Sequence, residues 1–172
     1  IDNDPYHLVL LCKDRKGYEN LCLMVSEAFI NGFYGKPRVD LALLEKYHEG
    51  LIALSACLAG AIPQYLMEEN YTSAKDYALK MADIFGEDNF YLELQDHSIP
   101  EQRPVNQGIL RLARETGLPL VVTNDAHYLR REDAKMQDVL MCIQMGKTVD
   151  DESRMKFQTE EFYLKSEEEL RE

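Results

Sequence analysis

Hydrophobic and polar positions follow two different periods along this chain. Short apolar runs typical of strands are separated by longer stretches in which apolar residues recur every three or four positions, as in a helix. The short runs predict strands over residues 6–12, 51–55, 90–95 and 120–123. The longer stretches predict helices over residues 18–29, 41–47, 60–69, 72–85, 104–116 and 131–144. This order predicts an α/β fold with a parallel sheet or part of a barrel, because four strands are too few for a closed barrel of about 250 residues.

Capping and turn residues mark where several of these elements begin and end. Asp40 and Thr72 are predicted to cap the helices that follow them, and Gly86 and Gly117 are predicted to end helices. The glycine and proline content of residues 32–38 predicts a loop.

The sequence changes character after Gly146. A polar stretch comes first, residues 162–164 then predict a short strand, and residues 166–169 have the pattern of a capped helix start. We expect the final segment to be a linker or the start of a following domain.

The strand at 120–123 runs directly into polar residues. Asp125 and His127 are two positions apart, so an extended chain points both side chains to the same side. Parallel α/β sheets place their chemistry at the carboxyl ends of the strands, and a carboxylate and an imidazole are good ligands for zinc or manganese. The alternative is a loop in which Asp125 caps the helix that starts near Arg131 and His127 has no role.

Other polar residues follow the preceding predicted strands. If all strands are parallel, Cys57 and residues 95–97 lie at the same edge as Asp125 and His127. A thiolate, imidazoles and a carboxylate at one edge would suit a metal ion.

Each of the additional candidates also has an alternative role. Cys57 lies among apolar neighbours and could be a small buried residue. His97 could stabilise a turn, and Glu93 could either face the rim or pair with a basic neighbour. His7 begins its strand, which is the wrong end for the rim, so the pattern alone gives it a structural role.

Composition narrows the class of protein. The chain has 172 residues, 45% of them hydrophobic, and a net charge of −12, which suits one domain with a substantial core and argues against tight nucleic-acid binding by this surface alone. No apolar run approaches the ~18 residues of a membrane span. The cysteines, which form no C-x-x-C pair, indicate reduced thiols in a cytoplasmic protein; they are Cys12, Cys22, Cys57 and Cys142. Because the chain opens with Ile1, we expect it to be a piece of something longer.

Several motifs occur in the order in which they occur in one known family. They are Y-H-L-V-L-L at 6–11, G-Y-E-N-L at 17–21, G-F-Y and K-P-R within 32–38, L-I-A-L-S-A-C-L-A-G at 51–60, Y-L-E-L-Q-D-H at 91–97, P-E-Q at 100–102, T-N-D-A-H-Y-L at 123–129 and F-Y-L-K at 162–165. On these motifs the chain resembles, nearly from end to end, the PHP (polymerase and histidinol phosphatase) domain of the bacterial DNA polymerase III alpha subunit.

The resemblance implies a distorted seven-stranded β/α barrel with a cluster of up to three divalent metals, usually zinc or manganese. In members with an intact cluster it implies a 3′–5′ exonuclease that proofreads for the attached polymerase. The metal ligands that it implies by motif are His7, Cys57, Asp125 and His127. The resemblance therefore overrules the structural role given to His7. Glu93 and His97 lie in a family motif and are additional candidates at the rim.

The chain also departs from the family. Nothing in these 172 residues matches the family's amino-terminal H-x-H pair or the carboxylates of the polymerase palm. We therefore expect residues 1–146 to be the carboxy-terminal part of a PHP domain, an incomplete barrel of about four parallel strands. Residues 147–172 are expected to lead into the following polymerase region. By itself this fragment is expected to hold at most a weakened metal site and to be catalytically silent.

For the complete protein, the resemblance implies a DNA-directed DNA polymerase, a nucleotidyltransferase that uses magnesium. The partners that it implies are DNA, the sliding clamp, the clamp loader and a proofreading subunit, in the cytoplasm and without a membrane. One alternative is a stand-alone metal-dependent phosphoesterase of the same superfamily. Another is a non-catalytic scaffold that docks a separate proofreading subunit.

Overall fold

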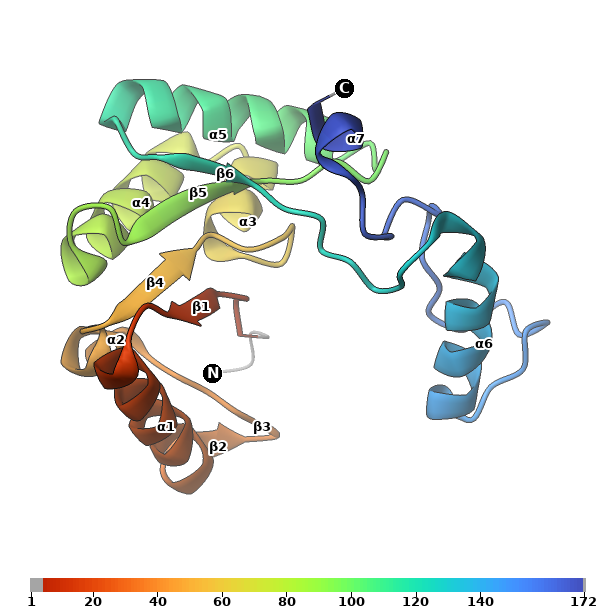
Figure 1. Ribbon diagram of the computed structural model, residues 1–172, viewed down its shortest axis with the longest axis horizontal. Coiled ribbons are helices and arrows are strands. Elements are labelled where there is room, and N and C mark those ends of the chain that lie inside the picture. Colours follow the sequence, from red (N-terminus) through yellow and green to blue (C-terminus); the bar gives the residue numbers. More distant parts are fainter. Residues whose placement is uncertain (1–4, 172) are drawn as a thin grey trace.

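The computed structural model describes residues 5–171 and is built around one curved, four-stranded sheet (Figure 1). The strand order is β1-β4-β5-β6. These strands span Val9–Cys12 (β1), Leu51–Leu54 (β4), Phe90–Leu94 (β5) and Leu120–Val122 (β6). All four lie within the strands predicted from the apolar runs, so the predicted α/β fold is confirmed.

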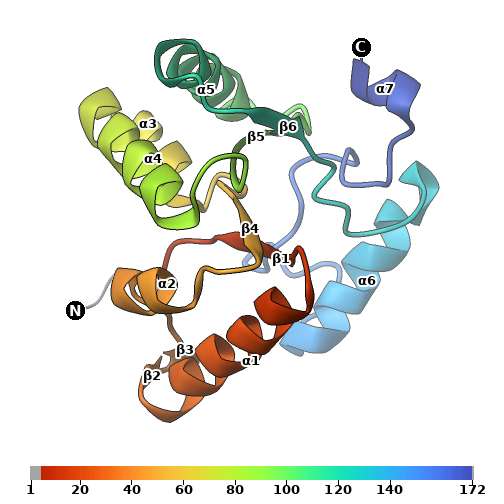
Figure 2. The same cartoon turned by 60° about the vertical axis from the view of Figure 1, so that its left-hand side comes forward.

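Five helices follow the outer side of the curved sheet, and the strands lie inside their arc (Figures 1 and 2). They span Arg15–Ile30 (α1), Leu41–Tyr47 (α2), Ala61–Met67 (α3), Tyr71–Phe85 (α4) and Gln102–Thr116 (α5). Their inner faces bury a core that includes Met81, Leu92 and Leu112, each with no exposed surface. The arrangement is that of an incomplete β/α barrel. None of the helices among residues 5–171 is both long and apolar enough to cross a lipid bilayer.

The direction of β1 differs from the prediction. Strands β4, β5 and β6 are parallel to one another, but β1 is antiparallel to β4, with Val9 opposite Leu54 and Cys12 opposite Leu51. The expectation of four parallel strands is therefore wrong for β1. Because β1 runs the other way, its start lies at the edge where β4 ends, and His7 reaches the rim from which the all-parallel interpretation excluded it.

A short hairpin replaces the loop predicted over residues 32–38. Strands β2 (Phe33–Tyr34) and β3 (Lys36–Pro37) pair antiparallel around Gly35, whose φ of +68° is left-handed. Two-residue strands are too short to leave a periodic signal in the sequence.

Most of the predicted helix ends are confirmed. Asp40 caps α2 by accepting a hydrogen bond from the Leu43 N–H at 2.9 Å, and Gly86 and Gly117 follow the last residues of α4 and α5. The cap predicted at Thr72 is wrong, since Asn70 accepts from the Ser73 N–H and caps α4.

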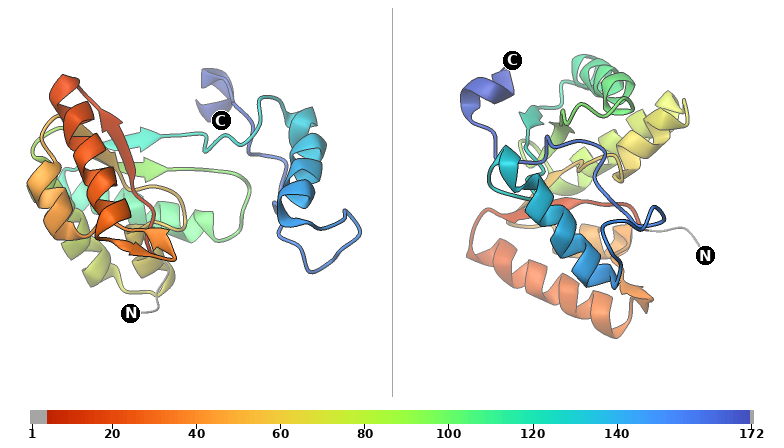
Figure 3. Two further views of the ribbon diagram at one scale, coloured as in Figure 1. Left: turned by 90° about the horizontal axis from the view of Figure 1, so that it is seen from below. Right: turned by 90° about the vertical axis from the view of Figure 1, so that its right-hand side faces the viewer.

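The carboxy-terminal part leaves the sheet and returns to it. After β6 the chain forms a 3₁₀ turn (Arg131–Asp133) and helix α6 (Ala134–Met145), which lies away from the sheet (Figure 3). Residues 157–166, here called the strap, then run back toward the strand ends. The strand predicted at 162–164 is reduced to one bridge between Tyr128 and Tyr163. The last helix, α7 (Glu167–Arg171), begins with the predicted cap, in which Ser166 and Glu169 exchange hydrogen bonds.

Candidate metal centre

The rim of the sheet is formed by the carboxyl ends of β4, β5 and β6 and by the start of β1. Cys57 follows β4, His97 follows β5, and Asp125 and His127 follow β6. His7 precedes β1 and is bridged to Gly60 in the loop after β4. The predicted candidates therefore all lie at one end of the sheet, as strand order and direction require.

His7 and Cys57, here called the first pair, face each other. His7 Nδ1 lies 3.6 Å from Cys57 Sγ. Zinc bonds of about 2.3 Å to sulfur and about 2.0 Å to nitrogen at a tetrahedral angle leave the two donor atoms about 3.5 Å apart. The first pair therefore has the spacing of two ligands of one ion. The main chain holds this spacing, because the His7 N–H donates to the Ala59 carbonyl oxygen at 3.0 Å.

The pKa of the Cys57 thiol is raised by its surroundings at the rim. Burial raises its pKa, and the carboxylates of Asp125 and Glu93 raise it further. The Asp125 carboxylate thus disfavours the Cys57 thiolate when no cation is present. A divalent cation bound between them would reverse this effect and favour the thiolate.

Asp125 and His127, here called the second pair, are also close to each other. His127 Nε2 lies 3.6 Å from Asp125 Oδ1, and both side chains are more than a third exposed. Asp125 has a φ of +42°, a left-handed conformation that residues other than glycine rarely adopt. The His127 N–H donates to the Phe162 carbonyl oxygen at 2.8 Å. The strap therefore fixes the backbone of the second pair.

The alternative role for Asp125 is wrong. The turn at Arg131 is capped locally, since the side chain of Asp133 accepts from the Arg130 N–H at 3.0 Å. Asp125 therefore does not cap this turn.

The two pairs do not merge into one cluster. Among residues 5–171, no three His, Cys, Asp or Glu side chains are spaced to hold one ion. The sequence predicts one group of ligands at a single edge of the sheet, whereas the structure has two separate pairs at that edge.

Glu93 lies beneath the rim and connects three strand ends. It is buried, and its carboxylate accepts hydrogen bonds from the Ala56 N–H at 2.9 Å, the Gln95 amide at 2.9 Å and the Thr123 hydroxyl. These donors belong to the ends of β4, β5 and β6. The basic neighbour considered for Glu93 is replaced by neutral donors.

His97 is almost fully buried, with 1% of its surface exposed. Nδ1 lies 2.8 Å from the Gln102 side-chain nitrogen, and Nε2 lies 2.7 Å from the Asn124 carbonyl oxygen. Its ring stacks on Phe162, with 4.2 Å between centroids and 6° between planes. The prediction that His97 stabilises a turn is therefore consistent with its contacts.

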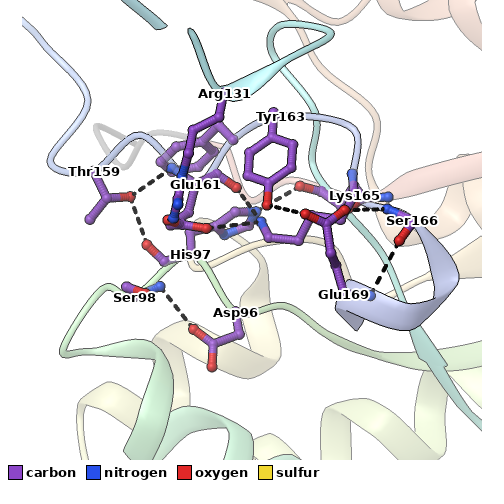
Figure 4. Close-up of polar contacts among 12 residues, drawn as sticks. Asp96, His97, Ser98, Arg131, Thr159, Glu161, Tyr163, Lys165, Ser166 and Glu169 are labelled. Carbon is purple, nitrogen blue, oxygen red and sulfur yellow. Dashed lines mark hydrogen bonds and ion pairs between the residues drawn. The ribbon is translucent and has the colours of Figure 1, made fainter. Parts of the chain in front are cut away.

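The strap supplies contacts that the sequence interpretation missed (Figure 4). The Thr159 hydroxyl donates to the His97 carbonyl oxygen at 2.6 Å, and the Lys165 N–H donates to the Asn124 side-chain oxygen at 3.1 Å. Glu161 forms ion pairs with Arg131 and Lys165. Burial lowers the pKa of the Lys165 ammonium group. The F-Y-L-K motif at 162–165 was the one available sign of this segment.

Comparison with known proteins gives a consistent result. The PHP domain family matches residues 1–97. The chain is 47% identical over 165 residues to the DNA polymerase III subunit alpha of Treponema pallidum (strain Nichols), which covers 96% of this chain and 14% of that protein. It is 45% identical over 171 residues to the protein of the same name from Thermus aquaticus, covering 99% of this chain and 14% of the relative. It is 42% identical over 175 residues to the DNA polymerase III subunit alpha of Helicobacter pylori (strain ATCC 700392 / 26695), covering 96% of this chain and 14% of that protein. The chain thus spans about 14% of the length of these relatives.

Proposed function

Since the chain belongs to the PHP domain family, we propose that it is part of the alpha subunit of a bacterial replicative DNA polymerase III. The observation that carries this proposal is the similarity over 96% or more of the chain to proteins named DNA polymerase III subunit alpha. The complete protein would then be a DNA-directed DNA polymerase that uses magnesium in its palm. It would act in the cytoplasm with DNA, the sliding clamp, the clamp loader and a proofreading subunit.

Within that protein, residues 1–146 would belong to the PHP domain and residues 147–172 would lead toward the polymerase region. Residues 147–172 would also help to shape the rim, because two residues of the strap, Thr159 and Lys165, form hydrogen bonds with His97 and Asn124. Taken alone, the 172 residues would have no exonuclease turnover. Metal-dependent turnover by this isolated piece would refute that part of the proposal.

The rim would bind zinc or manganese through His7, Cys57, Asp125 and His127. The donor set supports this, because it combines a thiol, two imidazoles and a carboxylate, and because each pair is 3.6 Å apart. When bound, the metal would supply a Lewis acid and an activated water for phosphodiester hydrolysis, as in a 3′–5′ exonuclease.

The residues of the chain would prepare this chemistry. The first pair would offer a soft thiolate and an imidazole at a fixed spacing. The Asp125 carboxylate would contribute negative charge that favours a bound cation, and the cation would in turn favour the Cys57 thiolate. Glu93 would keep the ends of β4, β5 and β6 at a constant separation through its three hydrogen bonds.

The test uses the full-length protein and a DNA primer with a mismatched 3′ end. Replacing Asp125→Asn should reduce bound metal and 3′–5′ excision at least about 10-fold, while DNA synthesis on a matched primer continues. The matched control is Asp150→Asn, which changes an exposed carboxylate far from the rim in sequence. Unchanged metal content and excision in Asp125→Asn would contradict the metal centre.

A second candidate function is a scaffold that docks a separate proofreading subunit. It is favoured by the separation of the candidate ligands into two pairs, with no three-donor cluster among residues 5–171. A scaffold predicts that full-length protein stripped of metal by a chelator still binds the proofreading subunit and never excises a mismatch.

A further inference from the structure

We infer that His97 is a positioning residue, which sets the Asn124–Asp125 turn through one fixed ring tautomer and does not itself bind metal. The inference rests on the proposed metal centre, because its consequence is the placement of the Asp125 carboxylate. Three steps support it: the location of the ring proton, the lack of a free ring nitrogen, and the conformation of Asp125.

The hydrogen bonds of Gln102 decide which ring nitrogen of His97 carries the proton. The His97 main-chain N–H donates to Gln102 Oε1 at 2.7 Å, which fixes the orientation of the Gln102 amide. The amide NH₂ then faces His97 Nδ1 at 2.8 Å. Since an NH₂ group can only donate, Nδ1 has to accept, and the ring proton lies on Nε2. Nε2 donates it to the Asn124 carbonyl oxygen at 2.7 Å.

This arrangement leaves neither ring nitrogen available to a metal. Both are engaged in hydrogen bonds, and one face of the ring is covered by Phe162 in near-parallel stacking. Gln102 belongs to the first turn of α5, and Phe162 belongs to the strap. His97 is therefore held from two elements that approach it from different parts of the chain.

The carbonyl oxygen that His97 holds belongs to the residue directly before Asp125. Asp125 has a φ of +42°, and such a backbone persists where its surroundings hold it in place. Asn124 is fixed at both ends: its carbonyl oxygen accepts from His97 Nε2, and its side-chain oxygen accepts from the Lys165 N–H. The left-handed turn that directs the Asp125 carboxylate therefore depends on His97.

His97 also connects the strap to the Asn124–Asp125 turn at the rim. The Thr159 hydroxyl donates to the His97 carbonyl oxygen, as Figure 4 shows. His97 thus accepts a hydrogen bond from the strap with its carbonyl oxygen and donates one to the turn with its ring. This explains how a residue with no free donor atom can still affect metal binding by its neighbour.

The first experiment reads the tautomer. Full-length protein is labelled with ¹⁵N at histidine, and the His97 signals are assigned by difference against His97→Gln. We expect Nδ1 to have the shift of an unprotonated nitrogen and Nε2 that of a protonated one, both unchanged when zinc is added. In Gln102→Glu a carboxylate faces Nδ1, so its signal should move to the protonated value. A zinc-dependent shift of His97, or a proton on Nδ1 in the wild type, would overturn the inference.

The second experiment uses two substitutions that mimic different halves of the ring. His97→Gln places an NH₂ near the position of Nε2 and can still donate to Asn124, whereas His97→Asn places its NH₂ near Nδ1 and cannot. We expect zinc affinity to fall about 10–100-fold in His97→Asn, a typical effect for a residue behind a ligand, and less in His97→Gln. His48→Asn is the matched control, because His48 lies at the exposed end of α2 and bonds to Glu45.

The results separate the two proposals. If Asp125→Asn weakens zinc binding and His97→Asn does not, the positioning role is wrong and the metal centre stands. If His97→Gln loses as much affinity as His97→Asn, the role of the Nε2 donor is wrong. If Asp125→Asn leaves zinc binding unchanged, the metal centre is wrong, and the ¹⁵N spectra alone decide the tautomer.

Discussion

The two pairs of the rim are alike in spacing and different in what holds them. The first pair, His7 and Cys57, is held by the main chain of the loop that follows β4, through the bridge to Gly60 and the hydrogen bond to Ala59. The second pair, Asp125 and His127, is held by the main chain and the aromatic rings of the strap, which lies 30 or more residues away in the sequence. The two donor atoms are 3.6 Å apart in both pairs, but the first pair is held by a neighbouring loop and the second by a segment that is distant in the sequence.

The difference indicates which pair is adjustable. The main-chain bonds of the first pair join the start of β1 to the loop after β4, so they lie directly beside the sheet. The strap contacts the loops after β5 and β6, and α6, which precedes it in the chain, lies away from the sheet (Figure 3). We therefore expect the second pair to respond to changes in the strap and the first pair to remain insensitive to them.

The largest expected effect comes from Phe162→Ala. Phe162 is 6% exposed and packs on His97, His127 and Phe157, so its loss should lower the free energy of unfolding by about 3 kcal/mol. Hydrogen exchange should become faster at the His127 amide and stay unchanged at the His7 amide. Leu164→Ala, an exposed position of the same strap, is the control, with an expected change within about 0.5 kcal/mol. Equal exchange changes at both amides would remove the distinction between the pairs.

Glu93→Gln should give a smaller effect that reaches both pairs. The amide keeps the size of the side chain but loses one of the two oxygens that accept from Ala56 and Thr123. The free energy of unfolding, measured in urea, should therefore fall by about 2 kcal/mol. Because Ala56 precedes Cys57 and Thr123 lies just before Asp125, amide exchange should become faster in both turns. Glu87→Gln, at an exposed site, should change neither quantity. Faster exchange in one turn only would show that Glu93 does not connect the strands.

The smallest effect is expected from Glu115, which serves as a reference for the body of the fold away from both pairs. Hydrogen bonds from Lys75 and Arg111 lower the pKa of Glu115 to about 2, below its ordinary value of 4.5. The carboxylate therefore contributes stability above about pH 4.5, and this contribution is lost as the pH falls toward about 2.

In Glu115→Gln, the free energy of unfolding should fall less steeply over the same acidic range than in the wild type. The zinc affinity measured at neutral pH should be the same in both proteins. An identical acid dependence would contradict the role of this carboxylate. A changed zinc affinity would show that the body of the fold and the rim are coupled.

The sequence predicts the body of the fold well because its signals are local. Apolar periodicity located the strands and the main helices, and Asp40 marked its helix start. Thr72 and Asn70 are both capping residues two positions apart, and composition does not distinguish them. The direction of β1 could not be predicted from its own residues, because it depends on how the chain returns through α1, the hairpin and α2.

The rim shows the same division. Asp125, His127 and Cys57 were found from their positions after apolar runs, whereas His7 was found only through the resemblance. The roles of Glu93 and His97 depend on partners that are distant in the sequence: Glu93 bonds to Ala56, 37 residues away, and Thr159 bonds to His97, 62 residues away. No period or spacing carries such contacts, and the strap motif at 162–165 did not indicate which residues it would cover.

The most direct test of the central claim is the absorption spectrum of the full-length protein loaded with cobalt(II) in place of zinc. A thiolate ligand gives cobalt an intense sulfur-to-metal charge-transfer band, so the account predicts that band in the wild type. Cys57→Ser should abolish it, and Cys12→Ser, which removes an exposed thiol of β1, should retain it. A spectrum without the band, or one that Cys57→Ser leaves intact, would contradict metal binding by the rim.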